Sequence, residues 1–255
     1  PAADEVLLEI EHDGEVIVSS WGAEGVDLDA ELLDISGRSD TGYVIEFDGE
    51  TLEGVIEFYD PIEGRGEHRI GTYDTYYGLY QIPKMQVAGT LVDKATLEET
   101  QIEGEGYHDH WWGVVNRYTK WEWLQVKFDN GWVAGFYEGR YDLLQSDLHR
   151  YAWLWRPGKG YTYFSEWTFD FEEIEDATRW RASIWGWAGS LEVTAEARVE
   201  RYQHKPVELA SIPLGEVDYY QYPIEATGSF DPLWGPTTEL TSETGMLEWG
   251  WDAIW

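Results

Sequence analysis

Hydrophobic and polar residues alternate with a period of two along most of the chain. Clear examples are Glu15–Val18, Tyr43–Phe47, Gly54–Phe58 and Leu191–Val199. Because successive side chains of a β-strand point to opposite faces, this pattern predicts strands with one buried and one exposed face. Helical spacing is confined to Val26–Ile35 and Leu143–Arg150, where we expect at most one or two helical turns.

Turn-forming residues separate these runs at roughly even spacing. The strongest signal is Asp129-Asn130-Gly131, which predicts a hairpin between strands at Trp121–Phe128 and Trp132–Tyr137. Many short strands joined by turns are typical of a β-sandwich or barrel. The alternation lapses near Asp142–Arg150, and the segments beginning at Gly104 and Gly245 look like corresponding strand openings. We therefore expect an all-β chain of two similar units, residues 1–142 and 143–255.

The chain is strongly acidic, with 50 Asp and Glu residues against 17 Lys and Arg and a net charge of −33. Its 16 Trp, 17 Tyr and 8 Phe residues supply too much apolar surface for a disordered chain. An acidic coat with few lysines is typical of adaptation to molar salt, where charge repulsion is screened within roughly 3 Å. The alternative is an acidic surface that recruits a cationic partner.

Charge and composition also restrict the partners and the chemistry. The negative charge excludes nucleic acid and anionic membrane surfaces as ordinary partners. With no Cys, thiol catalysis and thiolate metal sites are excluded. No apolar run reaches the roughly 18–20 residues of a spanning helix, so we expect a soluble chain without membrane insertion. The cytoplasm of a salt-adapted organism fits best, and a secreted or periplasmic location remains open.

The segment Tyr107–Gly113 concentrates chemically useful residues, since it holds two of the six His residues, an Asp and two Trp. On a strand, His108, His110 and Trp112 share one face, while Tyr107, Asp109 and Trp111 share the other. A carboxylate can fix a His tautomer, and an indole wall can stabilise a passing cation. This combination favours proton transfer to an apolar substrate, or stabilisation of charge that develops on it.

Two other interpretations of this segment remain open. His108 and His110 point the same way and could bind a metal, with a third ligand from His68, His149, His204 or a carboxylate. None of these lies at an informative spacing, so we expect no metal. Alternatively, the segment holds hydrogen-bonded core residues. There is no glycine-rich phosphate loop and no Gly-x-Ser-x-Gly turn, and we expect no cofactor.

Five segments carry a resemblance to a known family: Ile82–Leu91, Ile102–Gly113, Trp121–Gln125, Asn130-Gly131 and Gly245–Trp249. Together they resemble the carotenoid 1,2-hydratase / AttH-like lipocalin family, in which a Gly-Tyr-His-Asp-His-x-Trp-Gly segment precedes a Trp-x-Trp strand. The resemblance implies two packed lipocalin-like (calycin-like) β-barrel or sandwich units with an apolar pocket. It also implies an activity like those of the family's hydratases, cyclases and Diels–Alderases.

In the hydratases of this family, a downstream Tyr-x-Asp supplies a tyrosine and the acid that donates a proton. Tyr137 matches the tyrosine, but the acid position is Gly139. The nearest carboxyl groups are those of Glu138, on the opposite face of the strand, and Asp142. Because protonation of an alkene needs a well-placed acid, this departure favours cyclisation or isomerisation over hydration.

We therefore predict a cofactor-free cyclase, isomerase or hydratase of a hydrophobic polyene, isoprenoid or polyketide-like substrate. The alternative is a non-catalytic lipocalin-like carrier of an apolar small molecule. The candidate catalytic residues are His110, Asp109, His108 and Tyr137. The candidate substrate-binding residues are Trp112, Tyr107, Trp111 and Trp123.

Overall fold

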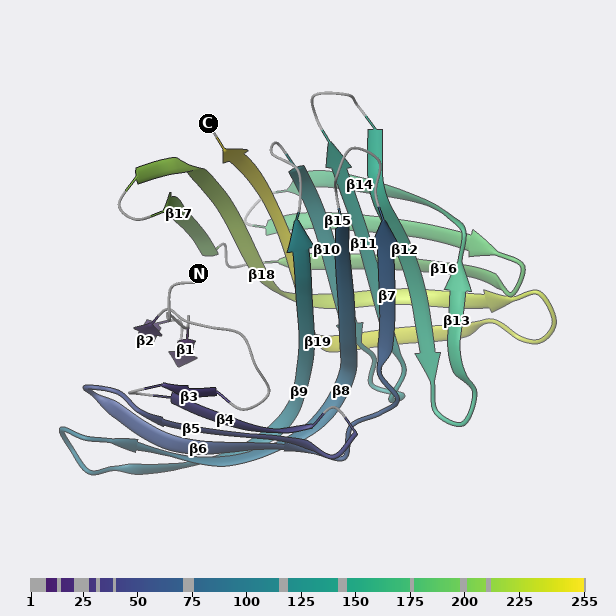
Figure 1. The fold of residues 1–255 in the computed structure, drawn as a ribbon. Coiled ribbons are helices and arrows are strands. Elements are labelled where there is room, and N and C mark those ends of the chain that lie inside the picture. Colours follow the sequence, from purple (N-terminus) through teal and green to yellow (C-terminus); the bar gives the residue numbers. More distant parts are fainter. Residues whose placement is uncertain are drawn as a thin grey trace. The chain divides into compact units, whose positions relative to one another are not determined.

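The computed structural model describes most of the chain. The described residues are 8–12, 15–20, 28–30, 33–38, 40–70, 76–114, 119–141, 146–174, 177–197, 201–209 and 212–254. In several strands, including residues 110–114, the description covers the backbone path and not the side chains. Every regular element in these ranges is a β-strand, which confirms the all-β prediction (Figure 1).

The chain divides into two compact units, Pro1–Arg69 with Tyr77–Gly113, and Ile70–Tyr76 with Val114–Trp255. The strands of the first unit are β1 (Leu8–His12), β2 (Glu15–Ser20), β3 (Leu28–Ala30), β4 (Leu33–Arg38), β5 (Gly42–Asp48), β6 (Leu52–Tyr59), β7 (Arg65–Ile70), β8 (Tyr76–Asp93) and β9 (Glu99–Val114). β1 and β2 form a separate hairpin, and the others form a sheet in the order β3-β4-β5-β6-β8-β7, with β9 also paired to β8.

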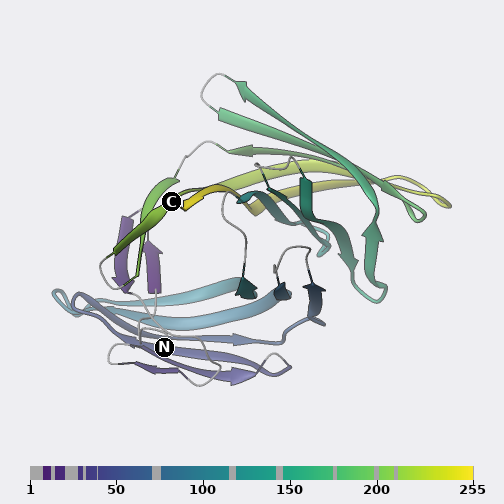
Figure 2. The ribbon, with the colours of Figure 1, turned by 45° about the horizontal axis from the view of Figure 1, so that its top comes forward.

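The strands of the second unit are β10 (Thr119–Lys127), β11 (Val133–Tyr141), β12 (Ser146–Arg156), β13 (Gly160–Phe164), β14 (Glu166–Ile174), β15 (Ala177–Gly186), β16 (Gly189–Ala197), β17 (Arg201–Leu209), β18 (Ile212–Pro232) and β19 (Thr238–Ile254). They form one sheet in the order β13-β12-β11-β10-β19-β18-β16-β15-β14, with β17 paired to β18. The long strands β18 and β19 curve strongly (Figure 2), and their register shifts between Ile224 and Ala226, as expected of a bulge that bends a strand.

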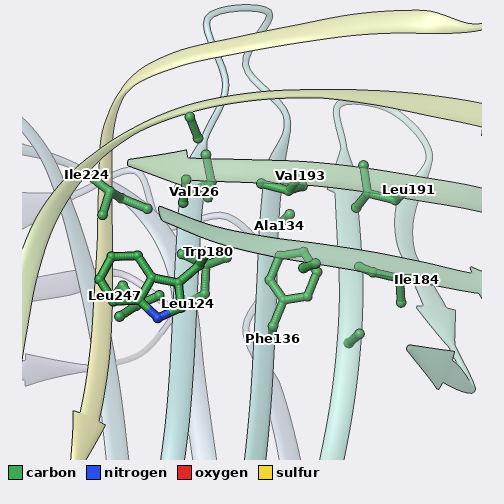
Figure 3. Close-up of a cluster of buried hydrophobic side chains, with 14 of the residues drawn as sticks. Leu124, Val126, Ala134, Phe136, Trp180, Ile184, Leu191, Val193, Ile224 and Leu247 are labelled. Carbon is green, nitrogen blue, oxygen red and sulfur yellow. The ribbon is translucent and has the colours of Figure 1, made fainter. Parts of the chain in front are cut away.

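This second sheet is a nearly closed barrel. A Cβ added at Gly186 on β15 would lie 3.4 Å from the Cα of Phe164 on β13, so strands far apart in the sheet order approach each other. The inward side chains form one hydrophobic core, part of which is shown in Figure 3. On β16, Leu191, Val193 and Ala195 are buried at alternate positions, as the sequence pattern predicts.

The predicted hairpin at Asp129–Gly131 is confirmed. β10 and β11 pair antiparallel, and the Phe128 N–H donates to the Trp132 carbonyl at 2.8 Å. Gly131 has a φ of +81°, a conformation that glycine adopts without strain. The Asn130 side chain accepts a hydrogen bond from the Trp132 N–H at 3.0 Å and stabilises the turn.

Other expectations were wrong. The stretches Val26–Ile35 and Leu143–Arg150 contain β3, the start of β4 and the start of β12 in their described residues, because strand pairing outweighs a short helical spacing. Gly104 and Gly245 lie inside β9 and β19 and do not open them. Residues 114–142, which the sequence pattern grouped with the motif, contribute β10 and β11 to the barrel sheet.

Candidate functional site

The motif Tyr107–Gly113 lies on β9, and its described side chains alternate between the two faces of the strand. The imidazole of His108 stacks on the ring of Tyr43, with centroids 4.8 Å apart and planes at 15°. The Tyr107 hydroxyl donates a hydrogen bond to Oδ2 of Asp109 at 3.1 Å. Tyr107 and Asp109 therefore share one face, and His108 occupies the other, as the period of two predicts.

A directed chain of hydrogen bonds ends at Asp109. Arg65 Nη1 donates to Gln81 Oε1 at 2.8 Å, and Gln81 Nε2 donates to the Tyr107 hydroxyl at 2.6 Å. Because an arginine can only donate, it fixes the orientation of the Gln81 amide. The Tyr107 oxygen accepts from that amide, and its single proton is directed to Asp109. The chain thus presents Asp109 with a donor and fixes its carboxylate in place.

The first two residues of this series of hydrogen bonds are buried, whereas its last residue is exposed. The side chains of Gln81 and Arg65 are 0% and 5% exposed, while Asp109 is exposed. Buried polar groups are costly unless they are hydrogen-bonded, so the Arg65–Gln81 pair has one favourable arrangement. The buried pair therefore supports a half-buried hydroxyl, on Tyr107, and the exposed carboxylate of Asp109.

Two glycines allow the strands around the chain to pack closely. A Cβ at Gly64, next to Arg65, would lie 2.1 Å from the Tyr80 hydroxyl oxygen. A Cβ at Gly106, next to Tyr107, would lie 2.6 Å from the ring of Phe58. Both distances are too short for any larger residue, so the glycine of the motif lets β9 lie directly against the aromatic side chains of the first unit.

His108 is held among aromatic rings. Besides the stack on Tyr43, the Tyr80 ring meets the imidazole edge-on at 6.5 Å. Tyr43 belongs to a buried cluster with Ile82 and Met85. Burial, followed by the neighbouring Tyr80 and Asp40, raises the pKa of Tyr43, so its hydroxyl stays protonated. These contacts fix the plane of the His108 ring.

Tyr137 and Trp123 lie in the second unit, directly opposite each other on β11 and β10. Their chain neighbours Phe136 and Leu124 belong to the barrel core, so Tyr137 and Trp123 face the outside of the barrel. Tyr137 stacks on Tyr151, with centroids 5.3 Å apart and planes at 16°. Trp123 is 7% exposed.

The position of the missing acid is filled by Tyr137. A Cβ at Gly139 would lie 2.8 Å from the Tyr137 hydroxyl oxygen, so the tyrosine occupies the space that a carboxyl side chain would need. Glu138 is 6% exposed and alternates with Tyr137 along β11, on the face that carries Phe136. Asp142 lies outside the described residues.

The structure thus brings Tyr107, His108 and Asp109 together with Arg65, Gln81 and Tyr43. The side chains of His110, Trp111 and Trp112 lie outside its description, and only their backbone on β9 is given. The sequence did not indicate Arg65, Gln81 or Tyr43. Gln81 directly precedes the segment Ile82–Leu91 that resembles the known family, so of these three residues it is the one that the sequence could have indicated.

A separate open groove lies on the first unit and contains none of the candidate residues. It has a volume of about 460 Å³ and is lined by Tyr59, Gln86, Val87, Ala88, Glu103, Gly104 and Glu105. Lys84 forms an ion pair with Glu105 at its edge. Its two carboxylates and amide make it unsuitable for an apolar molecule.

The described residues lack both a cluster of metal ligands and a membrane-spanning helix. Within those ranges, no three His, Asp or Glu side chains are grouped as a metal ion would require. The part of the chain that the structure describes contains no helix with the length and apolarity to cross a membrane.

Comparison with known proteins identifies the fold. The sequence matches no protein-family model and no curated protein. A putative AttH from Nitrosomonas europaea matches with a TM-score of 0.54 at 16% identity, over 85% of this chain and 67% of the other. Kievitone hydratase from Nectria haematococca matches with a TM-score of 0.55 at 13% identity, over 89% and 71%. CghA, solved with Sch210972, matches with a TM-score of 0.52 at 11% identity, over 87% and 67%. The chain therefore has the lipocalin-like all-β fold that these proteins share.

Proposed function

We propose that the chain is an enzyme that cyclises, isomerises or hydrates a hydrophobic polyene, isoprenoid or polyketide-like substrate without a cofactor. The fold supports this proposal, because kievitone hydratase is among the proteins that share it. The observation that carries the proposal is the chain from Arg65 through Gln81 and Tyr107 to Asp109. A buried, directed chain that ends at an exposed carboxylate is suited to holding that carboxylate in position to accept a proton.

The direction of the hydrogen bonds from Arg65 to Asp109 favours removal of a proton from the substrate. Since Tyr107 donates a hydrogen bond to Asp109, the Asp109 carboxylate acts as an acceptor. An accepting carboxylate can remove a proton from a substrate hydroxyl, or from a carbon beside a carbonyl, and Tyr107 holds that carboxylate in position. This supports cyclisation or isomerisation, with Asp109 as the base and Tyr107 as its positioning residue.

The remaining candidates receive roles in the same proposal. His110 and Trp112 face the substrate, where the indole stabilises developing positive charge and the imidazole relays a proton. His108 keeps the strand in place through its stack on Tyr43. Trp111 forms an apolar wall of the same substrate site.

The packed barrel weighs against the simplest form of the carrier alternative. Lipocalin-type carriers hold one ligand inside the barrel. Here the inward residues Phe136, Trp180, Ile184, Tyr222 and Leu247 belong to one contiguous buried core, so they fill the space that such a ligand would need. A carrier would therefore have to bind its ligand outside this core.

A panel of conjugated polyenes, prenyl alcohols and linear polyketide mimics tests the proposal. Loss of conjugation is followed by absorbance, and mass spectrometry separates hydration, which adds one water, from cyclisation or isomerisation, which leaves the mass unchanged. We expect Asp109→Asn and His110→Ala to lower turnover by about 100-fold or more and to leave ligand binding intact. The control Asp170→Asn changes an exposed carboxylate on β14 and should leave turnover unchanged.

The outcomes separate an enzyme from a carrier. Turnover of no panel member, together with tight binding of one, would show that the chain is a carrier. Turnover that survives both Asp109→Asn and His110→Ala would show that another site does the chemistry.

A further inference from the structure

Large apolar side chains project from one end of the barrel. Trp187 is 82% exposed, on the turn between β15 and β16. Trp234 is 88% and Leu233 63% exposed, on the turn between β18 and β19, and Trp185 nearby on β15 is 43% exposed. The Leu233 N–H donates to the Ala188 carbonyl at 3.1 Å, so the two turns lie side by side (Figure 1, right). We call Trp185, Trp187, Leu233 and Trp234 the tryptophan tip.

The tip is a rigid projection. Gly189 has a φ of +133°, and a Cβ there would lie 2.2 Å from the Asp231 carbonyl oxygen, so the two hairpins are in backbone contact. Thr237 donates a hydrogen bond to the Asp231 carboxylate at 3.0 Å across the base of the second turn. Pro232 precedes Leu233 and restricts the backbone further. The exposed indoles are therefore presented by a fixed backbone.

The turns of the tryptophan tip carry none of the charged residues that are frequent elsewhere in the sequence. The two turn segments, Gly186–Leu191 and Pro232–Thr238, contain no charged residue, although 26% of the chain is charged and its net charge is −33. Exposed apolar groups that are gathered together and rimmed by charge typically mark an interaction surface. Elsewhere in the described residues, large exposed apolar side chains such as Val55 and Leu97 are scattered.

We propose that the tryptophan tip anchors the protein to the surface of a lipid bilayer with neutral headgroups. Indole rings favour the membrane–water interface, where one side meets acyl chains and the N–H meets headgroups. A bilayer is fluid and accepts a projecting side chain without a matching pocket. Neutral headgroups are the best match, because the negative charge of the protein repels an anionic surface wherever salt does not screen it.

The area of the tip argues against a second copy of the chain as its partner. Taking about 250 Å² for a whole Trp side chain, the three indoles expose about 500 Å² together. A standard protein interface buries about 800 Å² on each partner. Two convex tips in contact would also bury only part of their area. A peripheral membrane contact has no such minimum, because a few inserted side chains are sufficient for reversible binding.

Flotation with phosphatidylcholine vesicles in molar KCl tests this proposal with the full chain. We expect the protein to rise with the vesicles, and Trp187→Ser/Trp234→Ser to lower its partition coefficient at least about tenfold. The matched control Val55→Ser/Leu97→Ser removes apolar side chains that are 44% and 78% exposed on the first unit, and should float like the unmodified protein. Far-UV circular dichroism verifies that the variants are folded, and each single Trp→Ser variant repeats the measurement with a smaller change.

Three results would overturn the proposal. The unmodified protein could stay in the aqueous fraction, or the double Trp variant could float as well as the unmodified protein. In the third case, sedimentation equilibrium would show a dimer that the double Trp variant converts to a monomer, with no flotation in either form. The tip would then be an interface between copies of the chain.

Discussion

Replacement of Gln81 by leucine removes the link between Arg65 and Tyr107. The side chain is fully buried, and leucine has a similar size, so the main effect is the loss of two hydrogen bonds and not a cavity. A hydrogen bond to a charged group contributes about 1.5–3 kcal/mol and one between neutral groups about 0.5–1.5 kcal/mol. We therefore expect Gln81→Leu to lower the free energy of unfolding of the first unit by about 3 kcal/mol.

A second substitution at the same position tests the direction of the chain. Gln81→Glu keeps an acceptor for Arg65 but replaces the amide donor that faces Tyr107 with a second acceptor. Tyr107 then donates its hydrogen bond to residue 81, and the hydrogen bond from Tyr107 to Asp109 is lost. We expect stability to stay within about 1 kcal/mol of the unmodified protein, while any turnover that depends on the Tyr107–Asp109 hydrogen bond falls.

Hydrogen exchange followed by mass spectrometry measures the effect on each unit separately. A loss of 3 kcal/mol corresponds to an increase of roughly 150-fold in exchange for the protected amides of β5, β6 and β8. Peptides from β15 and β16 belong to the second unit and serve as an internal control. If Gln81→Leu raised exchange in the first unit less than tenfold, the Arg65–Gln81–Tyr107 chain would not be the buried support that we describe.

Three further predictions concern packing, pH and salt. Gly135→Ala places a Cβ 2.3 Å from the buried ring of Trp153 and should lower the free energy of unfolding in urea by about 1–3 kcal/mol. The control Gly104→Ala meets nothing within 4 Å and should leave that free energy unchanged. Equal stabilities of the two variants would contradict the packing. The N–H groups of Thr96 and Ala95 hold the pKa of the Asp93 carboxyl below its ordinary value of 3.8. The Asp93 carboxylate therefore stabilises the β8–β9 turn fully above pH 3.8, and this stabilisation is lost as the pH falls through the lowered pKa. Amide chemical shifts of these two residues that do not move between pH 5 and pH 2 would oppose this account. Dialysis from molar into low salt should unfold the protein because of its net charge of −33, and an unchanged circular dichroism spectrum would argue against salt adaptation.

Local patterns in the sequence were sufficient for the strands and for the faces of the motif. Alternation depends only on neighbouring residues, and the Asp129-Asn130-Gly131 turn depends on the left-handed φ of Gly131. For the same reason the separation of His108 from Tyr107 and Asp109 could be derived from the period of two. The same alternation of faces and the same turn would be expected in almost any all-β fold.

Contacts between distant segments could not be derived in this way. Arg65, Gln81 and Tyr107 come from three strands, and nothing in the residues around Arg65 indicates its partner. The pairing of β10 with β19 joins Leu124 to Leu247, and it depends on how the barrel closes. The lapse in alternation near Asp142 therefore did not coincide with the division at Gly113 and Val114, because the described strands on either side of the lapse, β11 and β12, pair with each other in one sheet.

Two departures from a hydratase-like arrangement point in the same chemical direction. At Gly139 there is no carboxyl group, and the Tyr137 hydroxyl oxygen lies only 2.8 Å from where a Cβ would be. At Asp109 the carboxyl group accepts the Tyr107 hydrogen bond through Oδ2, an arrangement that suits a proton acceptor. Addition of water to an alkene must begin with a protonated acid beside the double bond. An oriented acceptor such as Asp109 is suited to removing a proton from a substrate, after which a folded substrate chain can close on itself. The mass of the product therefore discriminates between the reactions more sharply than the identity of the substrate does.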